Sequence, residues 1–165
     1  MKEILQDGNP VLREIAQEVL IKDIPSKEIK TLLKNMVTAL KDKEFGVALA
    51  APQIGVSKRV FIVAEKVFEE DKKEETLVYI NPKIVKKSRK TDDLEEGCLS
   101  VEGYFGTVTR AKLVTVEAYD ETGTKFTRGA SGLLAQIFQH EIDHLNGVLY
   151  VDHAHNIREV DPSKK

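Results

Sequence analysis

The sequence has a single cysteine, Cys98, and no tryptophan among its 165 residues. One cysteine excludes an intramolecular disulfide, which favours a reducing compartment. No apolar run approaches the roughly 18 residues that a membrane helix needs, and the first residues lack the apolar stretch of a signal peptide. We therefore expect a cytoplasmic protein with no membrane contact; a mature organelle protein is the alternative that these features leave open.

The sequence also lacks an excess of charge of either sign. It has 25 Lys and Arg against 27 Asp and Glu, a net charge of −2 at pH 7, which gives no electrostatic signal for direct nucleic-acid binding. Its hydrophobic content of 41% suffices for a globular core and argues against global disorder. The length is typical of one domain, and we expect a single catalytic domain over residues 1–165.

Helical periodicity is clearest in two segments near the ends of the chain. Apolar residues recur at helical spacing over residues 27–43, and Ser26 before them is a candidate N-cap. A last helix is predicted to begin after Ser131, which can cap it, and to end before Gly147.

The segment between these helices has the patterns of strands and turns. Pro52 and two glycines predict a shaped loop over residues 46–55, rather than a helix or inner strand, and the charges of Glu69–Glu75 predict a solvated loop. Asn81 and Pro82 are expected to end a strand, and a short polar tail is expected after residue 155. Strands are predicted at residues 59–65, 76–82, around 98–101, and in a hairpin of 112–120 with 124–129. The expected fold class is α+β, with antiparallel-type β-sheets packed around the C-terminal helix that carries HEIDH and with an N-terminal helix.

The chemistry of the chain centres on QHEIDHLNG, residues 139–147. His140, Glu141 and His144 form the H-E-x-x-H pattern of metal hydrolases. At about 100° per residue, both imidazoles lie on one helix face with the carboxylate beside them. A metal there would polarise a carbonyl and acidify water, and Glu141 could act as the general base.

Two histidines leave the third protein ligand unassigned. Tyr150 stands where one class of metalloprotease has its third histidine. His153 and His155 lie just past the helix, but histidines there are more often surface residues. Cys98, in the polar setting LEEGCLSVEG, is the remaining candidate, because a thiolate is a strong ligand for zinc or iron.

Three motifs together resemble the peptide deformylase family: GVALAAPQ at 46–53, EGCLS at 96–100 and QHEIDHLNG at 139–147. They stand in the family's order and at similar separations. The resemblance implies one divalent metal per chain held by Cys98, His140 and His144. That metal is most often Fe2+ in the family, and Zn2+, Ni2+ or Co2+ can substitute.

The resemblance also assigns the remaining roles. It implies that Glu141 is the general base and that the oxyanion donors are the Gln53 side chain and the backbone N–H of Leu99. The implied substrate is the N-formyl-methionyl end of a nascent polypeptide, from which the enzyme removes the formyl group as formate. The resemblance also implies transient contact with the ribosome. Glu96 and Arg110 match positions that form an ion pair in the family.

The substrate site follows from the same motifs and from helix geometry. The resemblance implies that the peptide backbone lies against Val47, Ala48 and Gly97. The methionine pocket is predicted from the helix itself, because its residues share the face of the two histidines; they are Leu133, Gln136 and Ile137.

Four positions depart from the family's usual pattern. Ala48 replaces a glycine, Glu102 a proline and Phe105 an arginine present in some members, and Gln136 is polar where the pocket is expected to be apolar. These departures favour an unusual substrate preference.

Three other readings remain open from the residues. A metallopeptidase would use the same helix to cleave internal peptide bonds. A cysteine hydrolase would use Cys98 as nucleophile with a histidine as base. A non-catalytic member would bind metal or formylated peptides without turnover.

Overall fold

The computed structural model describes residues 2–68 and 77–160. Along the chain the main elements are α1 (Lys27–Lys41), β1 (Ala48–Ala50), β2 (Val60–Val63), β3 (Val78–Lys87), β4 (Thr91–Cys98), β5 (Val101–Ala111), β6 (Leu113–Tyr119), β7 (Lys125–Ser131), α2 (Gly132–Leu145) and β8 (His155–Glu159). Short 3-10 helices lie at Pro10–Arg13, Ile21–Asp23, Ala51–Ile54, Glu65–Phe68 and Tyr150–Asp152. Among the described helices none has the length and apolarity to cross a bilayer.

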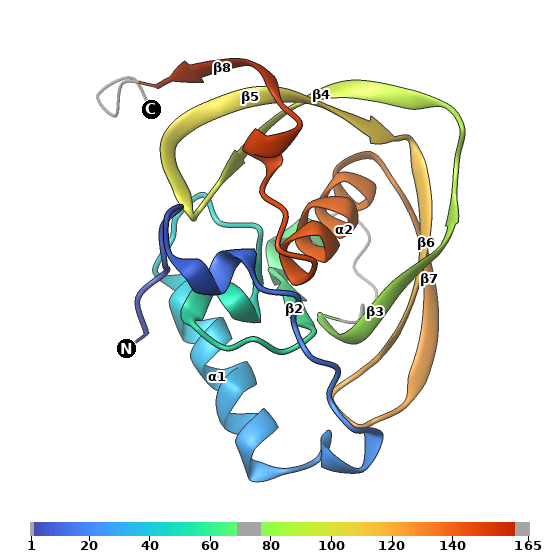
Figure 1. Cartoon of the computed structure of the whole chain (residues 1–165). Coiled ribbons are helices and arrows are strands. Elements are labelled where there is room, and N and C mark those ends of the chain that lie inside the picture. The colour runs from blue at the N-terminus through green and yellow to red at the C-terminus, as the bar shows by residue number, and fades with distance from the viewer. Residues whose placement is uncertain (1, 69–76, 161–165) are drawn as a thin grey trace.

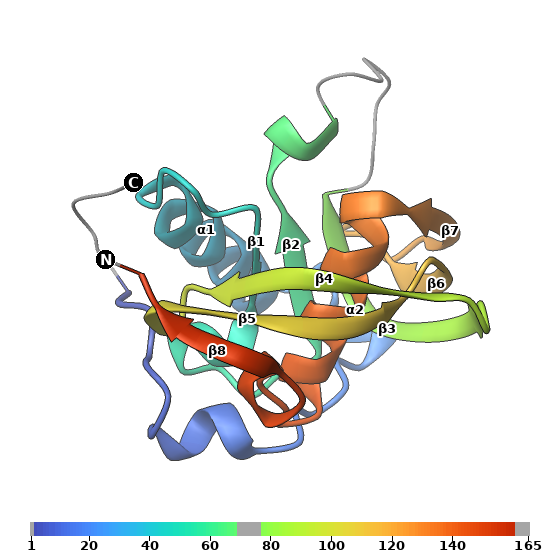
Figure 2. The same ribbon diagram turned by 90° about the horizontal axis from the view of Figure 1, so that it is seen from above.

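Two antiparallel sheets surround α2. One has the order β1-β2-β3-β6-β7 and the other β4-β5-β8. In Figure 1, α2 lies in the middle of the molecule, and Figure 2 shows β4 and β5 passing across it. The predicted α+β class, with antiparallel sheets around the C-terminal helix and with an N-terminal helix, is confirmed.

The N-terminal helix forms as its pattern predicts. The Ser26 side chain accepts a hydrogen bond from the Ile29 N–H at 3.3 Å, which satisfies one backbone donor of the first turn. The helix ends at Lys41, two residues before the predicted boundary. Its buried face packs on the sheet through Ile29, Leu32, Met36, Ala39 and Leu40.

The C-terminal helix is anchored by an aromatic cluster and by its C-terminal end. Phe138 lies edge-on to Tyr79 at a centroid distance of 5.0 Å, and Tyr79 stacks on Phe61 at 4.7 Å. The Arg59 guanidinium donates to the Leu145 carbonyl at 2.9 Å, which suits the negative end of a helix dipole. Ser131 stands at the N-cap, but its side chain makes no capping hydrogen bond within the described residues.

The predicted loop at 46–55 is wrong in part. Residues 48–50 form the edge strand β1, paired with β2 from Ala48 opposite Val63, and the Ala51–Ile54 3-10 helix follows. Ala48, Leu49 and Ala50 are at most 6% exposed, so the segment is buried as well as regular. The loop was predicted because Pro52 and Gly55 are residues typical of loops. In the structure Pro52 stands near the start of the 3-10 helix, and Gly55, at φ 87°, follows its end.

The expected end of a strand at Asn81 and Pro82 is also wrong, because β3 continues to Lys87. The register to β6 shifts between Ile80 and Lys83, and a proline is tolerated at such a bulge because no ladder N–H is needed. Asn81, at φ 52°, accepts from the Val19 N–H at 2.8 Å and donates to the Val19 carbonyl at 2.7 Å.

The strand expected around 98–101 is instead the turn of a hairpin. Cys98 ends β4 and pairs with Val101, which begins β5. β4 was not predicted because half of its residues are Asp or Glu, most of them exposed, and β8 falls in the predicted polar tail, where all five residues are exposed. The predicted hairpin at 112–120 and 124–129 is confirmed as β6 and β7; the loop predicted at 69–75 lies outside the described residues.

Gly147 lets the N-terminal segment pass close to the end of α2. It has a φ of 75°, and a Cβ there would meet the Arg13 carbonyl oxygen at 2.5 Å. Gly123 has a similar φ of 85°, but a Cβ there would have no neighbouring atom within 4 Å.

We predict that Gly147→Ala lowers the free energy of unfolding by about 3 kcal/mol, and Gly123→Ala by about 1 kcal/mol, because only the first adds a backbone clash to the φ strain.

Urea denaturation of both variants and the parent protein measures this difference. Equal losses for the two alanine variants would contradict the role of the Arg13 contact.

Candidate metal centre and active site

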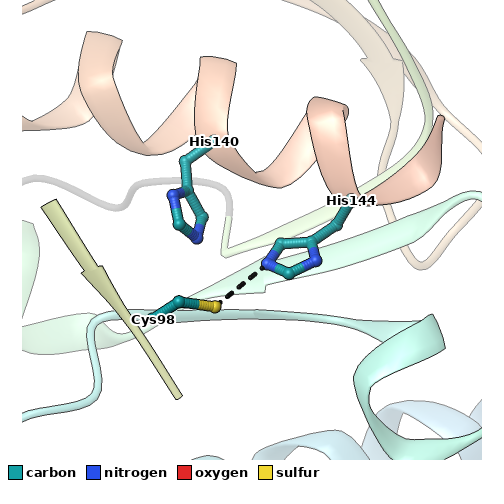
Figure 3. Close-up of side chains that lie close together, drawn as sticks. All are labelled: Cys98, His140 and His144. Atoms are coloured by element: carbon teal, nitrogen blue, oxygen red, sulfur yellow. Dashed lines mark hydrogen bonds between the residues drawn. The ribbon is translucent and has the colours of Figure 1, made fainter. Parts of the chain in front are cut away.

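Three potential metal ligands converge between β4 and α2. Cys98 Sγ and one ring nitrogen each of His140 and His144 lie within 4.8 Å of one another. Cys98 Sγ is 3.3 Å from His144 Nε2, and Figure 3 shows both imidazoles extending from α2 toward the sulfur. The one-turn spacing of the histidines thus places them on one face of the helix, as predicted.

The chemistry of these donors fits a divalent metal. A thiol with two imidazoles suits iron or zinc, and burial lowers the pKa of His144 well below its usual value, which keeps the ring in the neutral form that binds metals. Glu141 Oε2 is buried without a hydrogen-bond partner among the described residues, at the wall of the cavity that Cys98 and His140 also line. Buried polar atoms left unpaired are costly, so the group is better explained as a site for a bound partner than as a packed core.

A buried ion-pair network orients the first histidine. His140 Nδ1 lies 2.8 Å from Glu96 Oε1, which leaves Nε2 for the ligand cluster. Arg110 binds both oxygens of Glu96 at 2.7 and 2.8 Å, so the ion pair expected from the resemblance is confirmed. Arg110 also reaches Asp143 at 2.8 Å, a partner that the sequence did not reveal. Burial alone would raise the pKa of Glu96, but Arg110 and His140 lower it to about 2, so the carboxylate stays charged.

Glu141 is placed to exchange a proton. It lines the same cavity as Cys98 and His140 and is 4% exposed. Burial raises the pKa of Glu141 to about 7, a value at which a carboxylate both accepts and returns a proton near neutrality.

Gln53 is held with its amide beside the cysteine. Its Oε1 accepts from the Ala50 N–H at 2.9 Å, which fixes the orientation of the amide group. Its Nε2 then donates to Ser100 Oγ at 3.1 Å and lies 3.8 Å from Cys98 Sγ. The Gln53 amide therefore directs its N–H groups at Ser100 and Cys98, at the wall of the cavity. Leu99 lines the cavity next to it.

One cavity of about 750 Å³ contains nearly all of the predicted site. Its walls include Val47, Ala48, Gln53, Gly97, Cys98, Leu99, Leu133, Gln136, Ile137, His140 and Glu141. The remaining predicted residue, His144, is 1% exposed and lies against Cys98 from below the cavity. The structure therefore brings all twelve residues together, although their roles stay predictions.

The departures from the family pattern are accommodated around this cavity. Ala48 is an ordinary strand residue, absent from the residues with positive φ, so its methyl group causes no backbone strain. Gln136 donates to the Glu95 carbonyl at 3.0 Å, which ties the pocket to β4. Glu102 pairs with Lys43 at 3.6 Å at the exposed mouth. Phe105 packs against Gly97, where a Cβ would meet the ring at 2.7 Å.

Two supporting residues were missed by sequence reasoning. Gln139 is a buried clamp that accepts from the Ala111 N–H and donates to the Ala111 carbonyl; its place in the QHEIDH motif was the available signal. Tyr150 stacks beside His140 at 6.2 Å and donates to the Tyr104 carbonyl at 3.0 Å. His153 and His155 are exposed and lie outside the donor group found among the described residues.

The buried network predicts a large effect of Arg110 on stability. Arg110→Met leaves the charges of Glu96 and Asp143 without their partner, so we expect a loss of about 3–5 kcal/mol in the free energy of unfolding. Lys112→Met removes a half-exposed ion pair with Asp92, 3.4 Å long, and should lose less than about 1 kcal/mol.

Chemical denaturation of both variants at pH 7, without added metal, measures the contrast. A loss for Arg110→Met as small as that for Lys112→Met would show that the buried network does not stabilise the fold.

Comparison with known proteins supports the fold and relates the chain to one family. A family model described as polypeptide deformylase matches residues 1–160. The chain is 47% identical to the peptide deformylase of Carboxydothermus hydrogenoformans over 155 residues, covering 94% of each chain. It is 41% identical to that of Rhizobium meliloti over 158 residues, covering 96% of this chain and 87% of the relative.

Solved structures give the same result. A peptide deformylase from Legionella pneumophila superimposes with a TM-score of 0.83 at 42% identity, covering 94% of this chain and 87% of that one. A peptide deformylase from Synechococcus elongatus in complex with actinonin gives a TM-score of 0.82 at 35% identity, covering 94% and 79%. With a family model that spans almost its whole length and relatives of this similarity, the chain belongs to the polypeptide deformylase family.

Proposed function

We propose that this chain is a metal-dependent hydrolase that removes the formyl group, as formate, from N-formyl-methionine at the N-terminus of nascent polypeptides. The observation that carries the proposal is the convergence of Cys98, His140 and His144, with the buried carboxylate of Glu141 and the oriented amide of Gln53 at the same cavity. Membership of the family supports the choice of substrate.

Cys98, His140 and His144 would hold one divalent metal. Fe2+ is the proposed native ion, and Zn2+, Ni2+ or Co2+ would suit the same donors. When bound, such a metal supplies Lewis-acid polarisation of the formyl carbonyl and lowers the pKa of water.

The protein side chains carry the remaining steps. Glu141 takes a proton from the attacking water and delivers it to the leaving amine. The Gln53 amide and the Leu99 N–H donate to the carbonyl oxygen as negative charge develops on it, each contributing about 3 kcal/mol. Because the Ala50 N–H already fixes the orientation of the Gln53 amide, the amide would only have to turn one N–H from Cys98 Sγ to the substrate oxygen.

The substrate would lie between the edges of the two sheets. Val47 and Ala48 on the β1 side line the same cavity as Gly97 of β4, which supports an extended substrate backbone lying along these residues. The methionine side chain would enter the pocket of Leu133, Gln136 and Ile137. A cytoplasmic location and transient ribosome contact are further parts of the proposal.

A second candidate is a cysteine hydrolase, favoured by one distance. Cys98 Sγ and His144 Nε2 are 3.3 Å apart, within reach for a nucleophile and its base. This reading predicts activity without metal that alkylation of Cys98 abolishes, whereas the metal-dependent reading predicts no activity once metal is removed.

Formate release from a formyl-Met-Ala-Ser peptide tests the proposed function. The protein should be purified anaerobically and its metal content measured. We expect activity that a chelator removes and Fe2+ or Zn2+ restores. Glu141→Gln should lower kcat by about 100-fold or more with metal still bound, because proton transfer is lost.

Glu121→Gln, in the exposed turn between β6 and β7, is the matched control and should keep parental activity. Failure of metal-replete protein to release formate would refute the proposed function, and undiminished release after chelation would favour the cysteine hydrolase.

The ligand assignment has its own test. We expect Cys98→Ala and His144→Ala to lose stoichiometric zinc after dialysis, because each removes one of three donors. His153→Ala removes an exposed histidine and should retain one zinc per chain. Elemental analysis gives the result directly, and full zinc retention by Cys98→Ala would overturn the assignment.

A further inference from the structure

The N-terminal segment, residues 5–7, contacts both of the elements that carry the proposed oxyanion donors. The Leu5 N–H donates to the Gln53 carbonyl at 2.7 Å, and the Asp7 N–H donates to the Ser100 carbonyl at 2.8 Å. Gln53 lies in the 3-10 helix that follows β1, and Ser100 lies in the turn between β4 and β5. Figure 1 shows the start of the chain passing this turn. None of the steps proposed above uses this segment.

The side chain of Gln6 binds the same turn on both sides. Its Nε2 donates to the Leu99 carbonyl at 2.9 Å, and its Oε1 accepts from the Glu102 N–H at 3.3 Å. The same nitrogen lies 3.5 Å from the Ile4 carbonyl, at the limit of a hydrogen bond. Gln6 is exposed and is not among the described residues that line the cavity. It therefore acts on the site through these backbone groups.

The direction of the Leu99 N–H depends on how the turn is held. This N–H has no hydrogen-bond partner of its own within residues 2–68 and 77–160. Because each peptide unit is planar, the N–H turns only with the units on either side of it. The unit before Leu99 belongs to β4, which ends at Cys98.

The peptide unit after Leu99 is held by two contacts. Its carbonyl accepts from Gln6 Nε2 at 2.9 Å, and its N–H, which belongs to Ser100, donates to Cys98 Sγ at 3.4 Å. Sulfur is a weak acceptor, so the Gln6 amide supplies the stronger of the two contacts. Loss of this amide would leave the turn freer to rotate about Leu99.

We propose that Gln6 is a positioning residue of the oxyanion site, because its amide fixes the backbone from which the Leu99 N–H projects. The inference rests on the proposed function, since it explains how one donor of that reaction keeps its direction. A donor contributes most when its direction is set before charge develops. Supporting hydrogen bonds hold such groups within about 0.5 Å of the productive geometry.

Steady-state formate release from formyl-Met-Ala-Ser by metal-replete protein tests this role. Gln6→Met keeps the length of the side chain and removes its hydrogen bonds. We expect kcat to fall about tenfold, a fraction of the roughly 100-fold or more that follows loss of a whole donor. KM, the metal content and the inhibition constant of the product Met-Ala-Ser should keep their parental values, because the donor acts on charge that develops only during the reaction.

Two further variants separate positioning from general effects of the substitution. Gln6→Lys retains a donor for the Leu99 carbonyl and should recover most of the lost kcat. Gln17→Met makes the first substitution at another exposed glutamine, whose backbone hydrogen bonds go to Ser57 and Arg59, and should match the parent protein.

Three results would overturn the inference: a parental kcat for Gln6→Met, a rise in KM or a loss of metal that accompanies the fall in kcat, or a Gln6→Lys variant as slow as Gln6→Met. The parent protein tests the proposed function separately. If it releases no formate, both proposals fail, and if it does, the variants decide the role of Gln6 alone.

Discussion

The buried ion pair between Arg110 and Glu96 determines the geometry of the site. Arg110 belongs to β5 and Glu96 to β4, while Asp143 and His140, which complete the network, belong to α2. Cys98 lies two residues beyond Glu96 on the same strand, so the network fixes the distance between the thiol and the two imidazoles. Burying these charges is costly, and such networks often contribute more to a unique geometry than to stability; here that geometry is the alignment of a strand with a helix from distant parts of the chain.

Side-chain amides complete this alignment where the sheet ladders end. Gln139 pairs with both backbone groups of Ala111, Asn81 with both of Val19, and Gln53 with the Ala50 N–H. Buried backbone groups require partners, and an amide satisfies them without extending a strand. The active site can therefore lie between two sheet edges that do not pair with each other, which leaves room for a substrate backbone.

Sequence reasoning succeeded where a local pattern carries the information. The H-E-x-x-H spacing and the apolar period of α2 correctly predict the shared face of His140 and His144, and alternation predicts β6 and β7. Sequence reasoning failed where pairing between distant segments of the chain determines the structure. β4 has few apolar residues to mark it as a strand and forms because it pairs with β5 along its length. Asp143 and Tyr150 acquire their partners only when β5 crosses α2, so their contacts have no local signature.

One face of α2 carries most of the predicted site. From His144 and His140 through Ile137 and Gln136 to Leu133, one helix carries two of the three candidate metal ligands and three residues of the predicted methionine pocket. Residues on a regular element hold their relative positions better than residues on loops. Gln136 illustrates the consequence. Its amide donates to the Glu95 carbonyl, so part of its polarity is satisfied by the protein, and it links the pocket to the strand that carries Cys98. A change at this position would alter the shape of the pocket and the placement of β4 together, because the same side chain contributes to both.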